Sequence, residues 1–359
     1  MSTVQIDPEA SAVRPAPRPP LWFLRPQPHD RRRHLLAIAA FVVVVALAGP
    51  AIGGTSRANQ FLVNLWMMYS VAAIGFYWIF GLAGRFAFCQ TFMMAFGGYL
   101  SAWVTREGYP FIAGIGVAMA TTAMAAGIVG TLVRKAQHFY FAIATFAVTQ
   151  VGIIVFARAD GFTGPNGQTV GIGAPELFGY VFRRDAEVFW LFLGALAACL
   201  VVGALIERSP MRREAISARD NFTVAHLAGV RANRVHIVLF MLGSALGGLS
   251  GAMIGHWQGV MGSDSFGIDL TIGLFLILLL GGSDSLWGPV IGSAVFVALP
   301  KLLSDIERFG SIVYGVLLLA VVLALPNGIA ESVRQLLKWV SRVSRVSPVP
   351  SGRSTDAAG

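Results

Sequence analysis

Uncharged polar side chains recur inside otherwise apolar stretches of this 359-residue chain. They are Asn64, Gln90, Thr91, Thr145, Thr149, Gln150, Ser244 and Ser250. Hydroxyl and amide groups of this kind form hydrogen bonds but supply no strong acid, base or nucleophile. Two interpretations remain open: hydrogen bonds between packed helices, or a path along which a solute makes weak polar contacts. For such a path the candidates are Gln90, Thr145 and Thr149.

Motifs for enzymatic chemistry are missing from the sequence. No lysine follows a glycine in a G-x-x-x-x-G-K-[ST] phosphate loop, and we find no nucleophile elbow, H-E-x-x-H motif or paired carboxylates. Cys89 and Cys199 fall in apolar runs and predict neither a disulfide framework nor a zinc site. His256, at the end of an apolar run, is predicted to be an interfacial group rather than a metal ligand. We therefore predict no catalytic residues, no cofactor and no ATPase site.

The composition indicates where such a chain resides. Hydrophobic residues make up 55% of it, mean hydropathy is +0.68, and only 13% of residues are charged. Soluble proteins carry about 25% charged residues, because a chain of this size must cover a large surface. The composition excludes a soluble enzyme and a disordered protein. The net charge of +9 is explained by basic cytoplasmic loops of a membrane protein, so we expect no nucleic-acid partner.

Apolar runs near the length of a membrane-spanning helix, about 20 residues, recur along the chain. We predict spans at residues 35–52, 61–81, 86–105, 111–132, 139–157, 188–206, 235–257, 268–282, 286–303 and 311–325. The short run at 268–282 is either tilted or half of a re-entrant hairpin with the next one. The predicted fold class is an all-α, polytopic helical transmembrane bundle with about 8–10 spans.

The two ends of the chain differ in composition from the transmembrane domain, predicted at 35–330. Residues 1–34 alternate proline with arginine and are predicted to be a disordered cytoplasmic tail, and 331–359 a basic cytoplasmic tail. A signal peptide is disfavoured because no small-x-small cleavage site is evident. With the N-terminus inside and ten crossings, inside segments hold 20 of the 27 basic residues. Both termini are therefore predicted to be cytoplasmic.

The largest predicted cytoplasmic loop, 207–234, combines arginines with apolar residues. Pro210 can begin a short amphipathic helix there, and Gly229 can end one. Two interpretations are equally supported by the residues alone. The segment either docks a soluble partner or is a solvated connector that its arginines hold inside.

Glycines cluster at two other places. Gly243, Gly247, Gly248 and Gly251 follow a small-residue spacing that lets helix backbones approach closely, and Gly97 and Gly98 are expected to act similarly. The stretch 161–167, which is predicted to lie outside, is rich in turn residues and is interpreted as a loop near a substrate gate.

Five blocks, in this order along about 61–330, resemble the membrane permease of branched-chain (hydrophobic) amino acid ABC importers. The blocks are 81–90 with 96–99, 163–167 with 171–172, 213–229, 247–252 with 263–266, and 281–289 with Gly292. The chain departs from the family pattern at Ala87, Cys89 and Phe222, and Arg85 is unusual there.

The resemblance implies roles for individual residues. Coupling to an ATPase would involve Arg213, Arg219, Asp220, Asn221, Ala225 and Gly229. Gate and packing roles would fall to Gly164, Asn166, Gly167, Gly281, Gly282, Gly288 and Pro289.

The resemblance also implies partners: a homologous second permease subunit, two cytoplasmic ATPase subunits and an extracytoplasmic solute-binding protein, assembled in the lipid bilayer of a bacterial inner membrane. The implied cargo is a branched-chain or other hydrophobic amino acid, and the alternative cargo is urea or a short-chain amide.

Two other functions stay open at this point. An autonomous secondary carrier or facilitator would move solute by itself, although the scarcity of buried charge disfavours ion coupling. A membrane scaffold would move none.

Overall fold

The computed structural model describes residues 29–54, 56–134, 138–302 and 328. Its long helices are α1 (His29–Gly53), α2 (Arg57–Tyr77), α3 (Gln90–Arg106), α4 (Phe111–Leu132), α5 (His138–Arg158), α7 (Asp185–Arg208), α10 (Ala232–Gln258), α11 (Ile268–Gly281) and α12 (Gly288–Leu302). Its short elements are η3 (Trp78–Leu82), α6 (Asp160–Thr163), η4 (Pro165–Gly167), β1 (Gln168–Val170), β2 (Glu176–Leu177), β3 (Tyr180–Val181), α8 (Pro210–Asp220), α9 (Phe222–Leu227), β4 (Val260–Gly262) and η5 (Ser263–Phe266).

Helices occupy the first nine of the ten predicted spans, and the tenth, 311–325, lies outside the described residues. Six helical stretches are long and apolar enough to cross a membrane. Helices α1 and α12 each contain a shorter apolar stretch. The predicted helical, polytopic membrane bundle is thereby confirmed. Helix α1 begins at His29, inside the segment predicted as a tail, and the rest of that tail and the tail at 331–359 lie outside the described residues.

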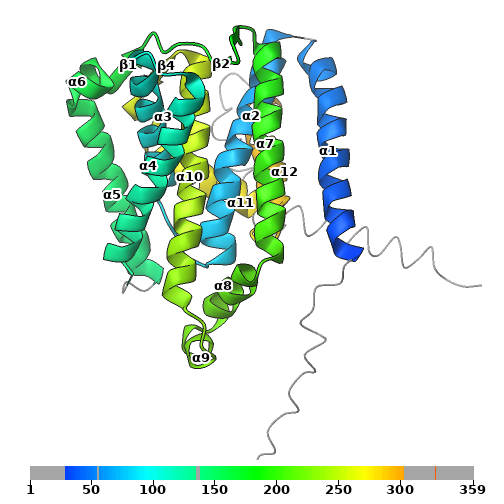
Figure 1. The fold of residues 1–359 in the computed structure, drawn as a ribbon, viewed down its shortest axis with the longest axis vertical. Helices are drawn as coiled ribbons and strands as arrows, with labels where there is room; N and C mark the ends of the chain where they lie inside the picture. Colours follow the sequence, from blue (N-terminus) through cyan, green and yellow to red (C-terminus); the bar gives the residue numbers. More distant parts are fainter. Residues whose placement is uncertain (1–28, 55, 135–137, 303–327, 329–359) are drawn as a thin grey trace, which may run out of the picture.

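The long helices run between two different ends of the molecule (Figure 1). Strands β1 and β4 lie at one end, which we call the strand end, and α8 and α9 lie at the other, the α8 end. Antiparallel β1 and β4 pair Gln168 with Gly262 and Val170 with Val260, and β2 pairs with β3. The sequence did not predict these strands, because two or three residues are too few to show the alternation of apolar and polar side chains that marks a strand.

Helix α10 packs against α2, α3 and α4 and forms the centre of the bundle. Its glycines touch backbone: a Cβ added at Gly251 would collide with the carbonyl of Met94, and one at Gly243 with the carbonyl of Gly75. Gly97 of α3 meets the backbone of Gly248 in the same way. This confirms the close helix packing that the glycine spacing predicts.

Two helix breaks interrupt the bundle. Helix α2 continues as the π-helix η3, and Ala83–Cys89 is then non-helical before α3 begins. The second break joins α11 to α12, which pack against each other. Helix α11 has 14 residues and is about 21 Å long, less than the ~30 Å of a hydrocarbon core, in line with the short span predicted there.

Candidate functional site

The predicted cytoplasmic loop folds as two short helices rather than one. Pro210 stands in the first turn of α8, where a missing N–H removes no helical hydrogen bond. Asn221 is extended, with φ −153° and ψ 99°, and its Oδ1 accepts a hydrogen bond from the Val224 N–H at 3.1 Å. Asn221 therefore ends α8 and caps α9. Gly229 follows with a φ of +84°, so the loop turns where the sequence predicted a helix to end.

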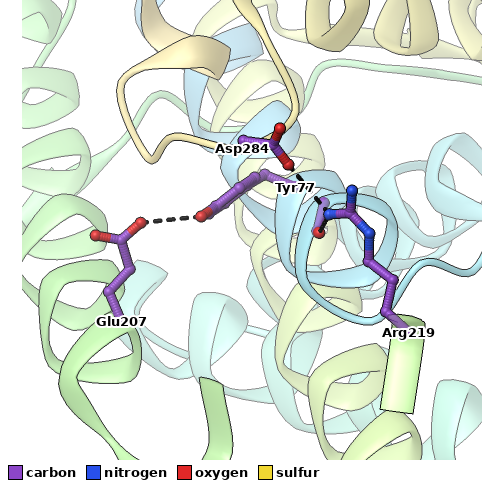
Figure 2. A network of polar contacts seen from close by, with 5 residues as sticks. Tyr77, Glu207, Arg219 and Asp284 are labelled. Atoms are coloured by element: carbon purple, nitrogen blue, oxygen red, sulfur yellow. Dashed lines mark hydrogen bonds and ion pairs between the residues drawn. The ribbon is translucent and has the colours of Figure 1, made fainter. Parts of the chain in front are cut away.

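Arg219 extends from α8 into the bundle (Figure 2). Its Nη1 donates to the carbonyl of Gly81, in η3, and to Oδ1 of Asp284 at 3.1 Å, in the α11–α12 break. Gly84 makes room for this side chain, because a Cβ there would lie 2.7 Å from Cγ of Arg219. The backbone of Gly84 also has a φ of +67°, which favours glycine. One arginine therefore connects α8 to both helix breaks.

A second contact joins α7, the helix before α8, to the end of α2. The hydroxyl of Tyr77, at the end of α2, donates to Oε1 of Glu207 at 2.9 Å, one turn before α8 begins. We call Tyr77, Glu207, Arg219, Asp284 and the Gly81 carbonyl the α8 network (Figure 2). Arg219 was predicted from the sequence as a coupling residue. Tyr77, Glu207 and Asp284 were not, because their partners lie far away in the chain.

The contacts of Arg219 differ in strength. The ion pair with Asp284 has side chains that are 35% and 75% exposed, and exposed pairs contribute about 0.2–1 kcal/mol. The Gly81 carbonyl lies near the C-terminal end of η3, where backbone carbonyls lack helical partners and a positive charge is favoured. π-Helices often mark functional sites. We therefore expect the bond to the carbonyl to hold α8 more strongly than the ion pair with Asp284 does.

The other predicted coupling residues lie on α8 and α9. Ala225 is buried and packs with Ala218 and Ala232, which holds α9 against the start of α10. Arg213 and Asp220 are exposed on α8. Helix α9 also exposes apolar side chains: Phe222, Val224 and Leu227. Exposed apolar groups at one end of a helix pair are typical of a docking surface.

The three predicted path residues surround the first helix break. Oγ1 of Thr145 accepts from the Phe88 N–H at 3.1 Å, and Oγ1 of Thr149 donates to the Phe88 carbonyl at 2.9 Å. Nε2 of Gln90 donates to the carbonyls of Ala72 and Gly243, at 3.3 and 3.0 Å. All three side chains are buried. Gln90 makes the interhelical hydrogen bonds of the first interpretation, whereas Thr145 and Thr149 bind the non-helical segment at Phe88. A role in a solute path stays a prediction.

One atom of Gln90 is relevant to that prediction. Its Oε1 is buried and has no hydrogen-bond partner among the described residues. Unpaired buried acceptors are uncommon and unfavourable. Gln90 therefore offers one acceptor in the middle of the bundle, next to the break.

The predicted gate residues 164–167 form a tight connection at the strand end. Gly164, Asn166 and Gly167 have φ values of +80°, +54° and +70°. The Tyr99 hydroxyl donates to the Gly167 carbonyl at 2.5 Å, and Oγ1 of Thr163 donates to the Phe156 carbonyl at 2.5 Å. The loop is thereby held to α3 and α5 by buried hydrogen bonds.

The remaining predicted residues shape the second break. Gly281 ends α11, Gly282 turns with a φ of +101°, and Gly288 and Pro289 begin α12. A Cβ at Gly281 would collide with the carbonyl of Gly288, so the hairpin closes only because both residues lack side chains. The packing role predicted for these glycines agrees with this geometry.

His256 lies at the strand-end terminus of α10 and is buried. Its Nε2 is 2.9 Å from Oγ of Ser101, and its Nδ1 is 2.7 Å from the Gly173 carbonyl. Its position at a helix end agrees with the predicted location, and its contacts are to protein groups. Cys89 and Cys199 are both free and buried.

An apolar cavity of about 670 Å³ lies between α4, α7 and α10. Its lining includes Trp78, Ile115, Trp190, Leu246 and Met253. The indole Nε1 of Trp78 is buried and has no hydrogen-bond partner in the part of the chain that the structure describes. The sequence did not predict this cavity, because its walls come from segments far apart in the chain.

Residues 60–322 match the protein family described as the permease component of branched-chain amino acid transport systems. The chain belongs to this family. It is similar to the high-affinity branched-chain amino acid transport system permease protein LivM of Escherichia coli K12, with 25% identity over 83% of this chain and 75% of LivM. It is also similar to LivH of the same strain, with 24% identity over 74% of this chain and 92% of LivH. No solved structure matches the chain. This permease-family chain is accordingly a multi-pass membrane protein of a transport system.

Proposed function

We propose that this chain is the permease subunit of a bacterial ABC importer and forms the translocation path for branched-chain or other hydrophobic amino acids. The observation that carries the proposal is Arg219, which ties α8 to η3 and to the α11–α12 break. The chain has no phosphate loop of its own, so we infer that separate ATPase subunits supply the energy.

In this mechanism the ATPases bind at α8 and α9. The exposed apolar side chains of α9 supply a docking surface, and Asn221 and Ala225 fix the position of α9. Movement of α8 then displaces Arg219, and with it the two helix breaks that Arg219 contacts. A ligand moves through such a cycle only if the two states of the bundle bind it with different affinity.

The proposed path passes the first helix break. Gln90, Thr145 and Thr149 are buried there. Oε1 of Gln90, which has no partner among the described residues, is suited to a hydrogen-bond donor such as an amino group. The apolar cavity beside Trp78 provides surface for an aliphatic side chain. These features favour a hydrophobic amino acid over urea, which has no apolar part.

The proposed orientation places the α8 end in the cytoplasm. Ser217 on α8 and Gln168 on β1 are both exposed and lie at opposite ends of the bundle. A single cysteine at Ser217 should react only with a reagent that reaches the cytoplasm, and one at Gln168 only with a reagent outside the cell. The reverse labelling would contradict the orientation.

The function is tested by purifying the full-length chain from its native membrane and identifying the subunits that remain with it. We expect an ATPase, a second permease and a solute-binding protein. Reconstituted together, they should take up leucine, isoleucine or valine against a gradient only with ATP. Uphill uptake by the chain alone would contradict the proposal, passive flux by the chain alone would indicate a facilitator, and uptake of urea instead would change the cargo.

A further inference from the structure

A small basic pocket lies at the α8 end, away from the α8 network. Arg85 of the first helix break, Arg134 after α4, and Asn233 and His236 of α10 line it, together with Phe141 of α5. These residues are far apart in the sequence, and the two arginines belong to different predicted cytoplasmic loops. Folding therefore brings two positive charges that are far apart in the sequence to the same pocket.

The Arg85 side chain is held in place by two contacts. Its Nε donates to Nδ1 of His236 at 3.0 Å, and its Cζ lies 5.1 Å from the ring centroid of Phe141. Since Nδ1 of His236 accepts this bond, the neutral ring carries its proton on Nε2. Burial lowers the pKa of Arg85 from its usual value, as expected for a cation that lacks a nearby anion.

No carboxylate of the described residues forms an ion pair with Arg85 or Arg134. Two arginines beside one pocket repel each other, and the repulsion is relieved if an anion binds between them. The pocket has a volume of about 10 Å³, close to the space needed for one water-sized group. It therefore fits a single oxygen atom of an anion whose remaining atoms stay at the mouth.

The position of the pocket identifies the anion. Gly130, Phe141 and Asn233 lie within the last turns of α4 and the first turns of α5 and α10, which is the depth of lipid headgroups if these helices cross the bilayer. The same turns of α4 and α5 expose Leu132 and Phe139, beside which acyl chains can lie. Basic pockets between membrane helices on the cytoplasmic side are suited to anionic headgroups.

We propose that Arg85, Arg134 and His236 form a binding site for the phosphate group of an anionic phospholipid. One non-bridging phosphate oxygen enters the pocket and accepts hydrogen bonds from Arg85. Arg134, which is exposed at the rim, contacts the outer face of the phosphate. None of its residues belongs to the α8 network, so lipid binding at this site can be measured without the ATPases or transport.

The test uses the full-length chain, purified in a neutral detergent and titrated with dioleoylphosphatidylglycerol. Native mass spectrometry counts the lipids retained by each chain. Parallel titrations use dioleoylphosphatidylcholine, inorganic phosphate and glycerophosphoglycerol, the headgroup without acyl chains. The variants are Arg85→Gln and Arg134→Gln, and the matched control is Arg234→Gln, an exposed arginine at the same end of α10 that does not line the pocket.

We expect one phosphatidylglycerol per chain to bind more tightly than phosphatidylcholine. Each pocket variant should weaken that binding about tenfold, because each removes a charge-assisted contact, and Arg234→Gln should leave it unchanged. High salt should weaken binding to wild type more than to the variants. Arg134 is exposed and its replacement should not disturb folding, so the test stands even if Arg85→Gln fails to fold.

Three outcomes would overturn the proposal. Equal retention of both lipids by wild type and variants would show that the pocket is not a lipid site. Binding of inorganic phosphate without preference for the phospholipid would show that the ligand is a free phosphate. Unchanged lipid binding, together with loss of an acidic protein subunit from the complex of the variants, would assign the pocket to a protein interface.

Discussion

The two ends of the bundle are held together by different kinds of interaction. At the strand end, β1 and β4 exchange backbone hydrogen bonds, and the buried hydroxyls of Tyr99 and Thr163 bind carbonyls of the adjoining loop. At the α8 end, the contacts of Arg219 and Glu207 are made by long side chains, and the partner Asp284 is largely exposed. The side-chain hydrogen bonds of the strand end are buried, whereas those of the α8 end are partly buried or exposed.

This difference suggests a division of roles. Buried, hydrogen-bonded elements open only with a large share of the global unfolding free energy, whereas elements held by few exposed contacts move at low free-energy cost. The strand end is therefore suited to keeping helices α3, α5 and α10 in place. The α8 end is suited to moving when a partner binds.

The strongest test removes the Arg219 side chain. In the reconstituted importer, Arg219→Ala should lower the solute transported per ATP hydrolysed by about tenfold to a hundredfold, because a charge-assisted bond between α8 and η3 is lost. Thermal stability should change little, since the Arg219 side chain is partly exposed. Uptake and ATP hydrolysis are measured in the same vesicles. Arg231→Ala, an exposed arginine at the start of α10, is the control, and an equal effect of both changes would contradict the role of Arg219.

The corresponding change at the strand end is Tyr99→Phe. It leaves the buried Gly167 carbonyl without its hydroxyl donor, so the free energy of unfolding should fall by about 1–2 kcal/mol. Thermal unfolding in detergent measures this loss, and Tyr109→Phe, at an exposed tyrosine, should show none. Transport per ATP should stay close to wild type. A loss of coupling without a loss of stability would reverse the roles of the two ends.

Tyr77→Phe should have an intermediate effect. The change removes the hydrogen bond to Glu207 but keeps the aromatic ring, which is buried, so about 1 kcal/mol of stability should be lost. Transport per ATP should fall only a few-fold, because Arg219 still connects α8 to η3. Measuring the double variant with Arg219→Ala separates the two links. If the effects of the two changes on transport per ATP simply add, the two contacts act independently, and the α8 network does not work as one unit.

The smallest effect is expected from Asp284→Asn. Because the carboxylate is 75% exposed, removing its charge should change stability by less than about 1 kcal/mol and transport per ATP less than twofold. The same assays apply, repeated at low and high salt. If Asp284→Asn uncouples transport as strongly as Arg219→Ala, the ion pair rather than the Gly81 carbonyl connects α8 to the bundle.

Much of the helical fold could be predicted from the sequence, because long apolar runs leave few alternatives to helices in a membrane. The predicted glycine face of α10 agrees with the structure. The division of that loop at Asn221 was missed, although asparagine is a common helix cap. The start of α3 at Gln90 rather than at residue 86 was also missed, since hydropathy does not distinguish a buried non-helical segment from a helix.

Composition and the local spacing of residues were enough to predict a helical, membrane-spanning chain that resembles a permease family. The folded chain was needed to find the partners of Arg219, the hydrogen bonds of Thr145 and Thr149 to the first helix break, and the pocket that Arg85 and Arg134 share. These contacts join segments separated by dozens of residues or more. Their geometry depends on how all the helices pack, which no local pattern of residues specifies.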